Sequence, residues 1–294
     1  MKISRRRLAL TVGLVVLLAV AAVVGLALLR DGDDSLRYPG RIAVREGCGL
    51  RHTFFDGKDQ RDLCLPNVWA VVSVSRNGER LAWDTGTGIF TANADGFNPV
   101  PVLVPPGANF DPSLSPDGQE MAFLHSSRDD GRYDLWVGST SIDNAEQVTN
   151  TRDISTVAWS PDGDWIAYVQ GWSEVTLEGE IFLVRPNGDD ETLLTRGDSP
   201  TWSPDGSRLA FAHAGSIWTI GVDGSEARMI VRNGESPAWS RDGDLIAFMR
   251  EVPCGKPVCK QRVFIVGATG GTARAIGPAY TAPRSPLWLP DPFE

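Results

Sequence analysis

Polar residues recur at one position of an internal repeat, at the expected end of the second strand of each copy, and these side chains could do chemistry. They are Thr85, His125, Gln170, His213 and Arg250. Acidic residues precede the first expected strand of three copies: Asp111, Asp198 and Glu235. Histidine beside carboxylates can transfer protons or hold a metal ion, and the whole set can bind a ligand by hydrogen bonds.

Two interpretations of this set stay open: it forms a binding surface, or strand ends are polar only because they meet water. The sequence has no Gly-x-Ser-x-Gly, phosphate loop, dinucleotide fingerprint or His-Glu-x-x-His motif. The Asp-Gly-Asp segments at 162–164 and 242–244 fall in expected turns, which explains them without calcium. We therefore assign no catalytic residue and expect neither a metal nor a cofactor.

The polar residues belong to a repeat whose clearest copy is Thr201–Phe211, read Thr-Trp-Ser-Pro-Asp-Gly-Ser-Arg-Leu-Ala-Phe. We use its tryptophan as the marker of each copy. The equivalent markers are Val74, Leu114, Trp159, Trp202, Trp239 and Trp288. They follow one another at intervals of 37 to 49 residues, and a period of about 40 is typical of proteins built from repeated units.

Each copy predicts a sheet of four antiparallel strands. In Ser-Pro-Asp-Gly, proline sets the first central position of a tight turn, aspartate favours the second, and glycine tolerates positive φ. A β-prone run such as 217–220 follows the resulting hairpin, and a fourth strand such as Thr192–Thr195 or Arg228–Val231 comes after another turn. Four strands in ~40 residues is the size of one propeller blade.

The two ends of the chain are expected to complete one blade between them. The last copy supplies a first strand, Ser285–Leu289, and the start supplies Arg41–Arg45, Leu50–Phe55 and Arg61–Leu65. With five full copies, this predicts an all-β, six-bladed β-propeller closed by pairing of the N- and C-terminal strands. Closure removes exposed sheet edges. In such a fold the polar residues lie on one face, around a central mouth, opposite the Ser-Pro-Asp-Gly turns.

The repeat also carries a family resemblance. Trp-Ser-Pro-Asp-Gly, followed by Ile-Ala-Phe or Leu-Ala-Phe and then by Ile-Trp or Ile-Phe, resembles the WD40-like repeats of the TolB-like propeller. It is similar also to the propeller halves of prolyl-oligopeptidase-type enzymes. The resemblance covers roughly residues 41–291 and implies the propeller fold, while the TolB likeness implies a binding role in the cell envelope.

The N-terminal region predicts a membrane anchor. Residues 1–7 hold four basic side chains, and the uncharged segment 8–29 has 22 residues, about 33 Å as a helix. The positive flank predicts a cytoplasmic N-terminus, a linker over 30–39 and an extracytoplasmic propeller over 40–294. A cleaved signal peptide, with Ala-Val-Ala at 19–21 as its cleavage signal, is the alternative.

Charge argues against nucleic acid as a partner. Five of the 28 basic residues and none of the 37 acidic residues lie in the first 30, so the remainder carries 23 basic residues and a net charge of −14. We expect a binding scaffold whose partner is an envelope protein or a glycan or peptide ligand. The alternative is an extracytoplasmic hydrolase or lyase that works at the central mouth with His125, His213 and a nearby aspartate, with or without a metal.

Four cysteines in an exported domain predict two disulfides. We favour Cys48–Cys64, which would close a loop of ~15 residues and contribute ~3 kcal/mol in the chain-entropy model. Cys254–Cys259 would then rigidify a single loop. Cross-pairing of Cys48 with Cys254 is the alternative, since these two residues lie in equivalent loops of neighbouring blades.

Overall fold

The computed structural model describes residues 41–46, 49–54, 60–63, 72–85, 88–93, 98–128, 130–141, 144–173, 175–176, 178–252, 260–280 and 286–289. The chain divides into two units, Met1–Tyr38 and Pro39–Glu294, and all described residues belong to the second. The expected anchor, the linker and all four cysteines lie outside the described residues. Among those described, no helix is long and apolar enough to cross a membrane.

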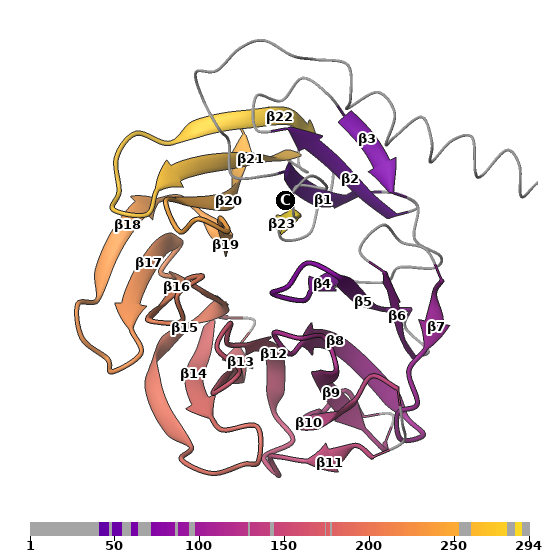
Figure 1. Ribbon diagram of the computed structural model, residues 1–294. Coiled ribbons are helices and arrows are strands. Elements are labelled where there is room, and N and C mark those ends of the chain that lie inside the picture. Colours follow the sequence, from indigo (N-terminus) through magenta and orange to yellow (C-terminus); the bar gives the residue numbers. More distant parts are fainter. Residues whose placement is uncertain are drawn as a thin grey trace, which may run out of the picture. The chain divides into compact units, whose positions relative to one another are not determined.

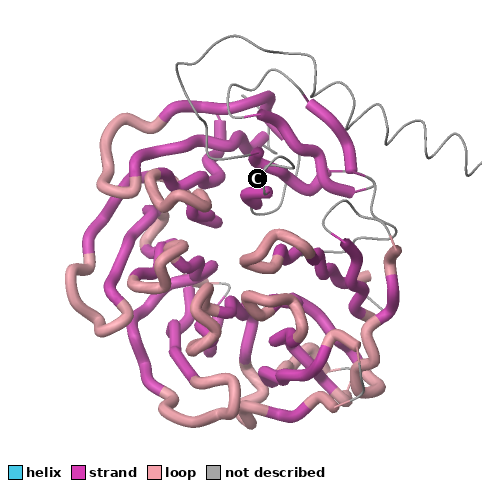
Figure 2. The backbone as a smooth tube through the Cα atoms, in the orientation of Figure 1, coloured by secondary structure: helices cyan, strands magenta, loops and turns pink. Residues whose placement is uncertain are grey.

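The described part consists of short strands joined by turns and loops (Figures 1 and 2). The strands are β1 (Arg41–Glu46), β2 (Gly49–Phe54), β3 (Gln60–Leu63), β4 (Val72–Val74), β5 (Arg80–Asp84), β6 (Ile89–Asn93), β7 (Val100–Pro101), β8 (Ala108–Leu114), β9 (Glu120–Ser126), β10 (Asp134–Ser139), β11 (Glu146–Gln147), β12 (Ile154–Trp159), β13 (Ile166–Ser173), β14 (Glu178–Val184), β15 (Thr192–Trp202), β16 (Arg208–His213), β17 (Ser216–Gly221), β18 (Arg228–Arg232), β19 (Glu235–Trp239), β20 (Leu245–Val252), β21 (Lys260–Gly267), β22 (Arg274–Tyr280) and β23 (Leu287–Leu289). This confirms the all-β prediction.

The strands form antiparallel sheets in chain order: β4 to β7, β8 to β11, β12 to β18 and β19 to β22. A further sheet joins the two ends of this unit, because β23 pairs with β1, which is followed by β2 and β3. The markers Val74, Leu114, Trp159 and Trp239 end the first strands of their sheets, Trp202 ends β15, and Trp288 lies within β23. Figure 1 shows β4, β8, β12, β15 and β19 gathered on the inner side of the sheets, with β7, β11, β18 and β22 on the outer side.

One strand belongs to two repeats. We expected a fourth strand at Thr192–Thr195 and a separate inner strand beginning after Asp198, but β15 runs through both without interruption. Its first half pairs with β14 and its second half with β16. Gly197 allows the passage, since its φ is 155° and a Cβ there would lie 2.5 Å from Phe211 Cδ2. The strand therefore crosses from the outer edge of one sheet to the inner edge of the next.

The Ser-Pro-Asp-Gly turns share one hydrogen-bond pattern, which explains the repeat. In the clearest copy, Ser203 Oγ donates to Asp205 Oδ1 at 2.6 Å and accepts from the N–H of Arg208 at 2.9 Å. Asp205 Oδ1 also accepts from the N–H of Ser207, at 3.0 Å. The same bonds recur at the serines of the other described copies, Ser75, Ser115, Ser160 and Ser240, with an asparagine as the acceptor at Ser75.

The core lies between neighbouring sheets. Met121 and Phe123 of β9, both fully buried, pack against Ala82 of β5 and Ile89 of β6. Polar contacts also tie the inner strands together, since the hydroxyl of Ser113 accepts from the N–H of the next marker at 2.9 Å. A sheet with both faces apolar must be covered on both sides, which stacking of successive repeats achieves.

Candidate functional site

Three inner strands share an irregularity at the end opposite their Ser-Pro-Asp-Gly turns. The pairing register shifts shortly before the marker in β8, β15 and β19. In each case one residue takes a positive φ between 50° and 52°, namely Asp111, Ser199 and Ser236. Non-glycine residues rarely adopt this conformation, so these β-bulges are a specific feature of the inner strands. Asp111 and Asp198 lie within their strands rather than before them, because pairing continues beyond the bulge.

The acidic residue Asp111 has a strongly raised pKa. Burial raises the pKa of Asp111 from 3.8 to about 7, although a hydrogen bond from the N–H of Val157 to Oδ2 at 2.8 Å opposes the rise. The charges of Asp84 and Asp198 raise it further. A carboxyl group that is kept from water and lies near other carboxylates favours its protonated form.

The pKa values of the other two predicted acids, Asp198 and Glu235, are also raised. Burial raises the pKa of Asp198, hydrogen bonds from the backbone and hydroxyl of Ser199 lower it, and the charge of Glu178 raises it. The pKa of Glu235, which is partly solvent-exposed, is raised by burial and then by the charges of Glu251 and Asp198. Because these groups influence one another, they form one acidic region, which we call the inner carboxylates: Asp84, Asp111, Glu178, Asp198, Glu235 and Glu251.

His125 is buried among its neighbours. His125 is only 5% exposed, and its Nδ1 is 2.9 Å from Asn109 Oδ1. The ring packs edge-on against Trp136, with centroids 4.8 Å apart. Burial lowers its pKa, and the charge of Asp134 raises it. His125 of β9 therefore contacts Asn109 of β8 on one side and Trp136 of β10 on the other.

His213 lies beside an inner carboxylate. Its Nδ1 is 3.1 Å from Glu178 Oε2, and Glu178 Oε1 also accepts from the N–H of Ala214. Its ring packs edge-on against Trp218, with centroids 5.9 Å apart. Gln170 is half-buried and pairs in register with Glu180 of β14. His213 thus joins the predicted polar set to the acidic region.

Thr85 and Arg250 make contacts close to their own strands. The hydroxyl of Thr85 donates to the carbonyl of Gly88 at 3.1 Å. Arg250 donates from Nε to the carbonyl of Asn233 at 2.6 Å, and its guanidinium lies 4.7 Å from the ring centre of Phe264. These contacts hold the loops at the end of the sheets opposite the Ser-Pro-Asp-Gly turns. Whether the predicted set also binds a ligand stays a prediction.

Three inner carboxylates were not predicted from the sequence. Asp84 and Glu251 are the direct neighbours of Thr85 and Arg250, so the strand-end pattern could have indicated them. Glu178 is the first residue of the third strand β14, a position that the pattern of acidic residues before the inner strands does not include. Among the described residues, no group of three or more His, Cys, Asp or Glu side chains could hold a metal ion.

Comparison with known proteins agrees with the geometry. The family model "TolB beta propeller domain" matches residues 74–292. "Uncharacterized protein YidR" of Escherichia coli is 30% identical over 118 residues, which are 37% of this chain and 26% of that one. "Tol-Pal system protein TolB" of Francisella tularensis is 31% identical over 105 residues, or 32% and 23% of the two chains. The matched part thus spans about a quarter of each curated relative.

Solved structures share the fold. The crystal structure of TolB from Acinetobacter baumannii superposes with a TM-score of 0.69 and 17% sequence identity, over 86% of this chain and 67% of that one. At that identity the likeness shows the fold alone. The family model covers more than half of the chain, including most of the described strands, so this chain belongs to the TolB β-propeller domain family.

Proposed function

We propose that this protein is an extracytoplasmic β-propeller scaffold that binds another protein of the cell envelope through its inner carboxylates. The observation that carries the proposal is that burial and neighbouring carboxylates raise the pKa values of Asp111, Asp198 and Glu235, which come from three different sheets. Carboxylates held close together and partly buried are unfavourable for stability, and such perturbed groups gather at functional sites. A partner that brings positive charge would relieve their repulsion.

A complete ring would supply the rigid frame for this site. Five repeats are followed by a sheet in which β23 pairs with β1, with Ile42 opposite Trp288. This pairing supports a six-bladed propeller closed by the two ends of the chain. Every blade would then contribute one inner strand to the same mouth, which is where propellers gather their loops.

The location rests on the N-terminal sequence. Four basic residues within 1–7 followed by the apolar segment 8–29 support a single membrane anchor with the propeller on the extracytoplasmic side. Pairing of Cys48 with Cys64 and of Cys254 with Cys259 would fit that oxidising compartment. The partner we propose is an envelope protein that presents a basic segment, since residues 31–294 carry a net charge of −14 by sequence.

Capture of partners by cross-linking in the native envelope tests the proposal. The parent is compared with a variant in which Asp111, Asp198 and Glu235 become Asn, Asn and Gln. A matched control neutralises three exposed acids, Glu79, Glu120 and Glu146, by change to Gln. We expect a protein that the parent and the control capture and the first variant does not.

A second variant tests the polar strand ends, with His125, Gln170, His213 and Arg250 all changed to Ala. Loss of the partner from this variant would extend the binding surface to that set. Equal capture by the parent and by the variant lacking the three acids would refute the proposal, provided that both are folded by circular dichroism.

A further inference from the structure

A cavity lies where the inner strands meet at their Ser-Pro-Asp-Gly end. Its volume is about 240 Å³, and its wall takes residues from the ends of β4, β8, β12, β15 and β19 and from the turns that follow them. Much of the wall is apolar, since it includes the markers and turn prolines Trp159, Trp202, Trp239, Pro116, Pro161 and Pro204. Drug-sized ligands usually occupy roughly 300 Å³ or more, so this space suits a few side chains of a peptide segment.

Two arginines give this apolar wall a positive charge. Among its described residues, only Arg76 and Arg241 are charged. Each stands at the turn position that proline fills in the other three described turns. Arg76 is exposed and Arg241 is half-buried, and Arg241 Nη2 donates to the carbonyl of Arg76 at 2.9 Å. The two turns that carry arginine therefore lie side by side at the rim of the cavity.

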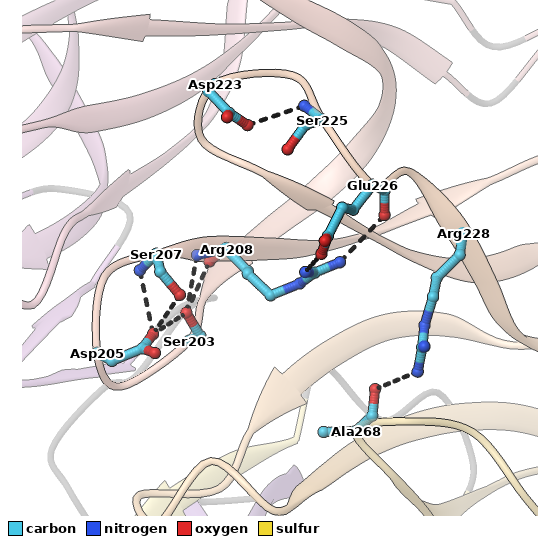
Figure 3. A network of polar contacts seen from close by, with 9 residues as sticks. All are labelled: Ser203, Asp205, Ser207, Arg208, Asp223, Ser225, Glu226, Arg228 and Ala268. Carbon is cyan, nitrogen blue, oxygen red and sulfur yellow. Dashed lines mark hydrogen bonds and ion pairs between the residues drawn. The ribbon is translucent and has the colours of Figure 1, made fainter.

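The aspartates of the turns are held away from this cavity. Within the described part of the chain, none of them belongs to its wall. In the clearest copy, Asp205 Oδ1 accepts from Ser203 Oγ and from the N–H of Ser207, as Figure 3 shows. Equivalent bonds hold the other turn aspartates within their own turns. An anionic group that suits the arginines must therefore come from outside these turns.

The two arginines flank the place where the two ends of the propeller unit meet. Arg241 follows β19 and Arg76 follows β4, and Figure 1 shows β23 between these two strands. Strand β23 contacts β19 and pairs with β1. The turns that follow β8, β12 and β15 carry proline instead. Among the described turns, arginine thus replaces proline only in the repeats next to β23.

The segment that follows β23 has the matching chemistry. Residues 287–291, Leu-Trp-Leu-Pro-Asp, align with Thr201–Asp205, so Pro290 takes the position that Pro204 has in the cavity wall. Residues 290–294 read Pro-Asp-Pro-Phe-Glu and lie outside the described residues. They contain two acids, one aromatic ring and no base. Five residues span up to ~17 Å when extended, which is enough to cross a cavity of this size.

We propose that residues 290–294 cover this cavity and are held there by Arg76 and Arg241. The two acids of the segment bond with the guanidinium groups, and its phenylalanine packs against the tryptophans and prolines of the wall. Strand β23 pairs with β1 at three described positions, and the covered cavity adds a second attachment beyond that pairing. The proposal is independent of the inner carboxylates, which lie at the other end of the inner strands.

Hydrogen exchange of the full chain in detergent, followed by mass spectrometry, tests the proposal. Asp291→Asn with Glu294→Gln removes the two negative charges, and Arg76→Gln with Arg241→Gln removes their partners while keeping a side-chain donor. Each double substitution should speed amide exchange in β23 and in residues 41–43 about fivefold. Combining all four substitutions should speed it no further, because either pair alone already removes the interaction.

A matched control is available at the same end of the sheets. Arg228 lies outside this cavity, and its Nη2 is 3.4 Å from the carbonyl of Ala268 (Figure 3). Arg228→Gln should leave the exchange of β23 unchanged, alone and together with the substitutions at 291 and 294. Thermal unfolding of all variants establishes that they are folded.

Photocross-linking identifies what covers the cavity. The full chain carries p-benzoylphenylalanine in place of Phe293, and mass spectrometry locates the cross-link after irradiation. We expect a cross-link to the cavity wall of the same chain. The proposal is overturned if the cross-link joins a second copy or another protein, forms outside the wall or does not form. It is also overturned if the exchange of β23 is unchanged, or if the arginine and acid substitutions act additively.

Discussion

Replacing Asp111 with asparagine should stabilise the protein above neutral pH and change it little in acid. The asparagine carbonyl can still accept from the N–H of Val157, which lies 2.8 Å from Asp111 Oδ2. The substitution removes a carboxyl group whose pKa is raised to about 7 by burial and by two neighbouring carboxylates, so that it stays protonated in the folded protein at lower pH.

The sign of the pH dependence follows from the number of protons bound by the folded and the unfolded state. Between 3.8, the ordinary value, and about 7, the folded protein binds the Asp111 proton and the unfolded chain releases it. The free energy of unfolding therefore falls as pH rises through this window and stays low above it. A difference of about 3 pKa units at 1.36 kcal/mol each corresponds to roughly 4 kcal/mol. Local relaxation reduces this, so we expect about 2–4 kcal/mol from Asp111→Asn at high pH.

Urea unfolding followed by tryptophan fluorescence, repeated between about pH 5 and pH 8, measures the effect. The parent should lose stability across this range and Asp111→Asn should lose much less. Asp117→Asn is the control: hydrogen bonds from the N–H of Gln119 and from Ser115 lower the pKa of Asp117 below its ordinary value of 3.8, so this substitution should destabilise the protein equally across the range and leave the pH slope unchanged. Equal pH slopes for the parent and Asp111→Asn would refute the reasoning.

Three further substitutions test the turns, the inner strands and the core. Ser203→Ala removes a hydroxyl that makes two short bonds in its turn and should cost about 1–2 kcal/mol in urea unfolding, more than Ser207→Ala at an exposed position of the same turn. Trp202→Phe loses the 2.9 Å bond from Nε1 to a neighbouring carbonyl and should lower the melting temperature, whereas Trp239→Phe, whose Nε1 has no partner among the described residues, should not. Phe123→Ala removes a fully buried ring and should cost about 3–5 kcal/mol, measured by the urea midpoint; an effect below that of Ser203→Ala would contradict the inter-sheet core.

The repeat made the sheets predictable because each copy carries its own turn chemistry. The same serine and aspartate bonds form wherever the two residue types recur, so the hairpins could be predicted residue by residue. The acidic region was predictable only in part. Asp198 and Glu235 lie four residues before their markers and Asp111 three residues before its own, whereas Glu178 is the first residue of a third strand, β14, outside the positions from which the acids were predicted.

Residue type alone could not predict which partner a side chain chooses. Arg80 and Arg208 occupy the same position and face a threonine of the same register, yet only Arg80 bonds to it. The difference comes from Glu226, which is close in space to Arg208 but belongs to the next turn of the chain. Competition of this kind depends on distances between elements, which the spacing of residues along the sequence does not contain.

The uninterrupted course of β15 has a consequence for how the molecule comes apart. In most repeats a loop separates the last strand of one sheet from the first strand of the next, so each sheet can open alone. Strands β12 to β18 instead share one continuous hydrogen-bonded sheet through β15. Breaking the pairing of either half of β15 therefore disturbs the pairing of the other half. Amide hydrogens from Ile154 to Arg232 should exchange as one cooperative unit, with a common free energy of opening, while the remaining sheets open separately.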